Sequence, residues 1–182
     1  MERKKVILTL CRVFPATHSK KGINTLFAVK LFAGRKIHTI RADEKGQWAQ
    51  KVADINAGNK ILCVREWTGR PYNSEQADIK QFVSVGLQDI TITYGANDEK
   101  PQAWVDGKPI PIETLAKNDG LELPDFIEWF FGSVHTGNVF KGKIIHNRGL
   151  FSPDSCYYQA ERGLSTTKIN KNKVLKTFTG HQ

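Results

Sequence analysis

The most informative stretch of the sequence is Gly34-Arg35-Lys36-Ile37-His38-Thr39-Ile40-Arg41. It follows an apolar run, residues 26–33, whose composition predicts a short buried helix. Gly34 then stands where a glycine usually ends a helix. Residues 37–41 are expected to form a strand. The stretch therefore predicts a helix, a tight turn and a strand that together carry three cations, an imidazole and a hydroxyl.

Strand geometry sorts the polar side chains of this stretch. Thr39 and Arg41 share one face of the expected strand, and His38 lies on the other. Strict alternation would point Lys36 away from Thr39. The two side chains meet only if Lys36 belongs to the turn after Gly34 rather than to the strand.

If Lys36 and Thr39 converge, they place a hydroxyl nucleophile beside an amine base. The lysine would have to be partly desolvated, or lie near a second cation such as Arg35 or Arg41, to act as a base near neutral pH. The alternative is that the cations are solvated and that Thr39 is an ordinary strand residue.

Short strands and short helices are expected along the rest of the chain. Further strands are predicted at residues 6–13, 60–67, 77–83, 89–94 and 140–146. Helices are predicted at 43–56, at 113–119 and after Pro124, and Asp106-Gly107 marks a tight hairpin. About six strands with short flanking helices indicate an α+β domain built as a small mixed β-barrel.

The composition is that of one globular domain followed by a basic tail. The 182 residues are 40% hydrophobic and carry a net charge of +9. That charge favours polyanions such as RNA or nucleotides as partners. Apolar periodicity fades after residue 147. We therefore expect a domain at 1–147 and a basic C-terminal extension at 148–182, partly ordered at best.

The cysteines and histidines indicate neither a disulfide scaffold nor a metal site. Cys11, Cys63 and Cys156 form no CxxC pair, which fits a reducing, cytoplasmic compartment. Cys11 and Cys63 lie in apolar runs and are expected to be buried. The five histidines lack metal-ligand spacing, so no metal or organic cofactor is expected. No stretch resembles a signal peptide or a membrane span, so no membrane partner is expected.

The motif resembles the GxK…TIR signature of ASCH domains, a group related to the PUA fold. Here it reads Ala33-Gly34-Arg35-Lys36, then Thr39-Ile40-Arg41. Within that group it is most similar to small bacterial N4-acetylcytidine amidohydrolases, whose run reads L-A-G-R-K-T-I-T-I-R. This chain differs by the inserted Phe32 and by Ile37 and His38. The resemblance implies a PUA-like barrel, with Lys36 as the base and Thr39 as the nucleophile.

The same family uses a glutamate as a third site residue. The best-aligned position here is Asp119, which is one methylene shorter, and Glu122 and Glu66 are the alternatives. The expected catalytic residues are thus Lys36, Thr39 and Asp119. The expected substrate-binding residues are Gly34, Arg35, His38, Arg41 and Glu66.

Two functions from different classes remain open at this stage. The Lys36 and Thr39 pair favours an amidohydrolase acting on an acylated pyrimidine nucleoside of the N4-acetylcytidine type. The basic charge favours a non-catalytic RNA- or nucleotide-binding module of the ASCH/PUA-like kind. Trp67 and Tyr72, which flank a turn holding Arg70, could stack a base, or the tryptophan could belong to the core.

Overall fold

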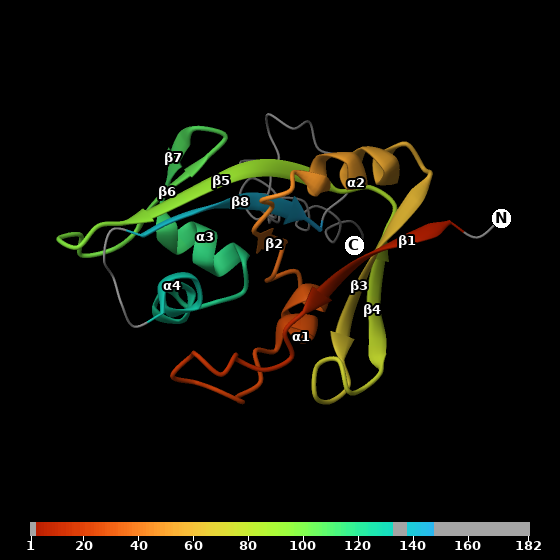
Figure 1. Ribbon diagram of the computed structural model, residues 1–182, viewed down its shortest axis with the longest axis horizontal. Coiled ribbons are helices and arrows are strands. Elements are labelled where there is room, and N and C mark those ends of the chain that lie inside the picture. The colour runs from red at the N-terminus through yellow and green to blue at the C-terminus, as the bar shows by residue number, and fades with distance from the viewer. Residues whose placement is uncertain (1–2, 133–137, 148–182) are drawn as a thin grey trace, which may run out of the picture.

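The computed structural model describes residues 3–132 and 138–147, which form an α+β fold. Two open sheets, of three and five strands, and four short helices make up this part of the chain (Figure 1). The expected basic extension, residues 148–182, lies outside the described residues.

The three-stranded sheet places the 34–41 motif inside a long connection. Its strand order is β1-β3-β4, formed by Lys4–Leu10, Lys60–Trp67 and Gln76–Phe82. β1 and β3 run parallel, so their connection must cross from one end of the sheet to the other. That connection contains α1, β2 and α2, with bounds Phe27–Phe32, His38–Arg41 and Gln47–Asn56.

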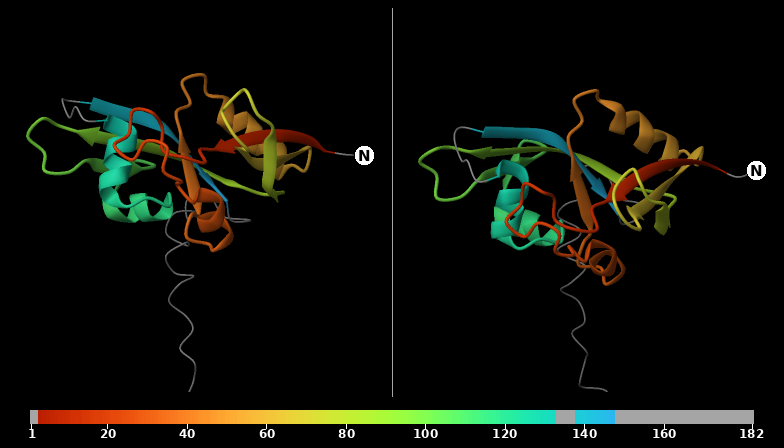
Figure 2. Two further views of the ribbon diagram at one scale, coloured as in Figure 1. Left: turned by 90° about the horizontal axis from the view of Figure 1, so that it is seen from below. Right: turned by 60° about the horizontal axis from the view of Figure 1, so that its bottom comes forward.

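The five-stranded sheet is antiparallel and has the motif strand at its edge. Its order is β2-β8-β5-β6-β7, where the last four are Asn138–His146, Gly86–Tyr94, Gln102–Val105 and Lys108–Ile110. Figure 2 shows two helices on one face of this sheet, α3 (Ile112–Asn118) and α4 (Leu123–Phe131). Buried and less buried positions alternate along β5, as expected for a strand with one covered face.

The two sheets share one hydrophobic core and meet beside the motif. The core cluster includes Leu8 and Leu10 of β1, Ile40 of β2, and Ile92 of β5. A side-chain bond crosses between the sheets, because Arg41 Nη2 on β2 donates to the carbonyl oxygen of Thr9 on β1 at 2.6 Å. The motif strand is therefore held from both sides, by β8 and by the end of β1.

The sequence prediction of an α+β fold is confirmed, and two of its details differ. Eight strands rather than about six occur in the described residues, because two short strands flank the predicted Asp106-Gly107 turn, where both residues have positive φ. The strands of residues 3–132 and 138–147 form two open sheets, and no closed barrel is formed by these residues.

The prediction that the helix before Gly34 is buried holds for only one of its sides. Val29 and Phe32 on α1 are 59% and 64% exposed, whereas Phe27 and Leu31 are buried. Residues four apart lie on the same side of a helix, so α1 contacts the core along one narrow stripe. An apolar composition alone does not reveal which side that stripe is on.

Candidate functional site

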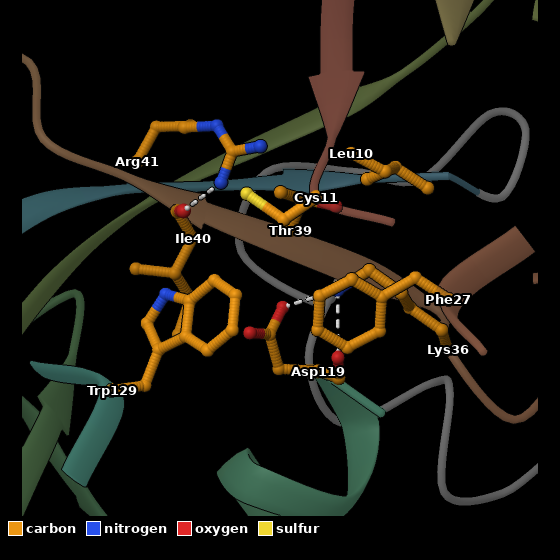
Figure 3. A pocket seen from close by; sticks show the side chains of 9 residues that line it. All are labelled: Leu10, Cys11, Phe27, Lys36, Thr39, Ile40, Arg41, Asp119 and Trp129. Atoms are coloured by element: carbon orange, nitrogen blue, oxygen red, sulfur yellow. Dashed lines mark hydrogen bonds and ion pairs between the residues drawn. The ribbon is translucent and has the colours of Figure 1, made fainter. Parts of the chain in front are cut away.

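A small cavity lies where the end of β1 meets β2, and four of the eight predicted site residues line it. Its lining, shown in Figure 3, consists of Leu10, Cys11, Phe27, Lys36, Thr39, Ile40, Arg41, Asp119 and Trp129. We call it the Thr39 cavity. Its volume is about 10 Å³. That volume is room for about one water molecule.

The turn after α1 brings Lys36 into this cavity. Gly34 has a φ of 70°. Glycine adopts this conformation without strain. The backbone N–H groups of Arg35 and Lys36 then both donate to the carbonyl oxygen of Lys30, at 2.8 and 3.0 Å. Because β2 begins at His38, Lys36 lies outside the strand, and the alternation of side chains along β2 does not point it away from Thr39. The condition for Lys36 and Thr39 to share a site is met.

Lys36 forms a buried ion pair with Asp119. Its Nζ lies 2.8 Å from Asp119 Oδ1 and 2.6 Å from the Asp119 carbonyl oxygen. The two side chains are 1% and 7% exposed. The ammonium group also lies 4.3 Å from the centre of the Phe27 ring, at a cation–π distance. The predicted lysine and the best-aligned carboxylate are thus in direct contact.

The C-terminal end of α3 presents Asp119 to Lys36. Gly120 follows with a φ of 81°, and a Cβ atom added to it would lie 3.1 Å from Lys36 Cβ. The Asn118 carbonyl oxygen accepts a bond from the backbone N–H of Ile37 at 2.9 Å. Lys30 Nζ donates to the Gly120 carbonyl oxygen at 2.8 Å. The motif and the end of α3 are therefore joined by several bonds.

Burial moves the pKa values of the ion pair toward each other. Desolvation lowers the pKa of Lys36 and raises the pKa of Asp119, and in each case the charge of the partner opposes the shift. The proton shared by the pair is therefore held less firmly on the lysine than it would be in water. A lysine in this setting can take part in proton transfer.

Thr39 contributes a buried hydroxyl that no described residue satisfies. The residue is 2% exposed, and its Oγ1 has no hydrogen-bond partner within residues 3–132 and 138–147. Most buried hydroxyl groups are hydrogen-bonded, because an unpaired one is destabilising. This hydroxyl lines the Thr39 cavity together with Lys36 and Asp119.

Arg41 gives the site an excess of positive charge. Its guanidinium donates to the carbonyl oxygens of Ile40 and Thr9, at 3.0 and 2.6 Å, which fixes its position. Burial lowers the pKa of Arg41, and Asp119 opposes that shift. Two cations, Lys36 and Arg41, face one carboxylate in the cavity lining. Such a site favours a group that is negative or becomes negative during a reaction.

Other residues predicted for the site lie elsewhere. Arg35 and Glu122 are exposed, and Glu66 is half-buried on β3. None of the three lines the Thr39 cavity, and neither does Gly34, whose role is to form the turn.

His38 faces a second buried polar group on the other side of β2. Its ring lies edge-on to His146, its cross-strand partner on β8, with 5.7 Å between ring centroids. Burial lowers the pKa of His38 well below its ordinary value and lowers the pKa of His146 to about 4. His146 Nε2 lies 2.8 Å from Gln88 Oε1. Both histidines are therefore neutral in the folded protein near pH 7.

Five residues of the cavity lining were not predicted as site residues: Leu10, Cys11, Phe27, Ile40 and Trp129. The rings of Phe27 on α1 and Trp129 on α4 lie beside the cavity with 5.7 Å between their centroids. Cys11 was expected to be buried and is exposed, so that prediction is wrong, whereas Cys63 is buried as expected. The predicted strand at 6–13 included Cys11, whereas β1 ends at Leu10, so Cys11 lies in the loop that follows the strand. Residues in such loops often reach a site.

The chain matches no known protein-family model, and no curated protein or solved structure is significantly similar to it. Within the described residues, no helix is long and apolar enough to cross a membrane.

Proposed function

We propose that this protein is an ASCH-like amidohydrolase, with a PUA-like domain, that removes the acyl group from an acylated pyrimidine nucleoside of the N4-acetylcytidine type. One observation supports this most. The buried hydroxyl of Thr39 has no partner among the described residues and shares its cavity with the Lys36–Asp119 pair and Arg41. A nucleophile, a base and a cation therefore line one cavity.

The Lys36–Asp119 pair supplies the base. Burial shifts both pKa values toward the neutral pair, in which Asp119 holds the proton and Lys36 is an amine. The amine takes the Thr39 hydroxyl proton as the Oγ1 attacks the acyl carbon. The resulting ammonium then gives its proton to the leaving nitrogen as the C–N bond breaks.

Arg41 stabilises the oxyanion that forms when Thr39 attacks. The two bonds to backbone carbonyls hold the guanidinium in place before the reaction starts, and its further N–H groups are donors for the negative oxygen. A water molecule then hydrolyses the Thr39 ester and releases the acid.

The test is hydrolysis of N4-acetylcytidine followed by chromatography. We expect the wild type to release cytidine and Thr39→Val and Lys36→Ala to release none. Lys117→Ala is the matched control, because Lys117 is an exposed lysine on α3, two residues before Asp119. Retained turnover in folded Thr39→Val would exclude this mechanism. Absence of turnover in the wild type would exclude the substrate class.

A second candidate, a non-catalytic RNA-binding module, is supported by the turn between β3 and β4. Tyr72 there is 89% exposed and has a φ of 65°, and its ring centroid lies 5.3 Å from that of Trp67. An exposed tyrosine beside a half-buried tryptophan, in the turn that holds Arg70, offers a stacking surface for an unpaired base. RNA binding that weakens steeply with salt and is lost in Tyr72→Ala, without turnover, would favour this function over the amidohydrolase.

A further inference from the structure

We propose that Cys11 is a covalent modification site at the mouth of the Thr39 cavity, open to small neutral thiol-reactive electrophiles. The reactivity of the thiol is inferred from geometry alone. The expected consequence, loss of turnover because the added group blocks the cavity, rests on the proposed amidohydrolase function.

The position of Cys11 is fixed by the fold. The residue follows the last residue of β1, and its carbonyl oxygen accepts a bond from Thr25 Oγ1 at 2.7 Å. The residue is exposed, whereas Thr39, Lys36 and Asp119 in the same lining are buried. Solvent therefore reaches the cavity lining at Cys11, so an incoming small molecule meets this residue before the three buried ones.

A second observation indicates that the cavity is built to receive a ligand. The Thr39 hydroxyl lines it without a hydrogen-bond partner among the described residues, although the residue is 2% exposed. A small polar group carried into the cavity would provide that partner. An electrophile with a carbonyl or amide group suits the lining for this reason.

Charge also favours reaction at Cys11. In Figure 3 the Cys11 sulfur and the Arg41 guanidinium lie on the same side of the cavity. Both residues line the cavity, so a fixed cation is present where negative charge develops during attack on an electrophile.

Iodoacetamide is a suitable probe because it is small and neutral. Its reaction forms an S–C bond, breaks the C–I bond and releases iodide, while the thiol proton passes to solvent. The acetamide group that remains has several heavy atoms. The cavity has room for about one water molecule, so a group of that size attached at its mouth blocks the entry of substrate.

Cys63 is the matched control within the same molecule. It lies in the middle of β3, between β1 and β4, and is 0% exposed. A thiol enclosed between paired strands is reached only when the sheet opens. The two cysteines therefore differ in access while sharing the chain, the buffer and the reagent.

The experiment treats the full-length Cys156→Ser protein with iodoacetamide and measures alkylation of each remaining cysteine by peptide mass spectrometry. We expect Cys11 to react at least about tenfold faster than Cys63, a difference that disappears in urea. Equal rates in the folded protein, or an unreactive Cys11, would overturn the proposal.

Turnover of N4-acetylcytidine is followed in the same samples and in Cys11→Ser. Inactivation should match the extent of Cys11 alkylation, and Cys11→Ser should keep its own starting activity during treatment. Full activity after complete alkylation would overturn the placement of Cys11 at the cavity mouth. If untreated protein shows no turnover, the proposed function fails, while the relative alkylation rates still decide whether Cys11 is the modification site.

Discussion

Thr39→Val should abolish turnover and at the same time stabilise the fold. Valine has nearly the shape of threonine, so the substitution removes the hydroxyl and leaves the packing in place. Thr39 Oγ1 has no partner among the described residues. A buried hydroxyl in that state is destabilising by about 1–3 kcal/mol. The free energy of unfolding should therefore rise by about that amount in Thr39→Val.

Thr25→Val is the matched control for this prediction. Thr25 is 1% exposed, but its hydroxyl donates to the Cys11 carbonyl oxygen at 2.7 Å. Losing a satisfied bond should lower the free energy of unfolding by about 1 kcal/mol. Urea unfolding monitored by tryptophan fluorescence measures both variants. If Thr39→Val is destabilised as much as Thr25→Val, Thr39 has a partner in the folded protein and the argument for a free nucleophile fails.

Three further predictions test the site and its surroundings. Burial lowers the pKa of His146 from 6.5 to about 4, so the folded protein resists protonation of this residue. The free energy of unfolding should therefore fall as the pH drops below the pKa that His146 has in the unfolded chain. His146 should contribute about 1.4 kcal/mol per pH unit to the slope of the free energy of unfolding against pH. Urea unfolding should therefore give a smaller slope in His146→Leu. Gly120→Ala should reduce turnover because the new Cβ atom displaces Lys36. Gly107→Ala is the control, since Gly107 also has positive φ but has no neighbour near its Cβ position, so this change should reduce only stability. Equal turnover in the two variants would contradict the contact between Gly120 and Lys36. Lys36→Met should lower the free energy of unfolding by about 3–5 kcal/mol, because it leaves the Asp119 carboxylate buried without a partner. Adding Asp119→Leu should restore most of that loss, and thermal unfolding measures both variants.

Local features of the fold could be predicted from the sequence. β3 has the predicted bounds, and Gly34 ends the α1 region with positive φ as expected. These features depend on nearby residues only, such as a β-branched run or a glycine after a helix. Strand alternation requires Lys36 to lie in the turn after Gly34 if it is to meet Thr39, and in the structure Lys36 precedes β2.

The features that were not predicted depend on contacts between distant segments. The neighbours of His38 and Cys11 are set by β2 pairing with β8 and by β2 meeting the end of β1. No local periodicity encodes such pairings. For the same reason the sequence could suggest a barrel but could not show whether the edges of the two sheets close on each other.

The long separation between the two halves of the ion pair has a consequence for folding of the growing chain. Lys36 and Asp119 are 83 positions apart in sequence. Until the ribosome has synthesised α3 and Asp119, Lys36 has no carboxylate partner. Its ammonium group therefore stays in water, because burying an unpaired charge is unfavourable. The Lys36–Asp119 pair can then form only in a slow stage of folding, when non-local contacts close. A truncated or nascent chain ending before Asp119 would therefore show neither the protected turn nor any activity, whatever secondary structure it has already acquired.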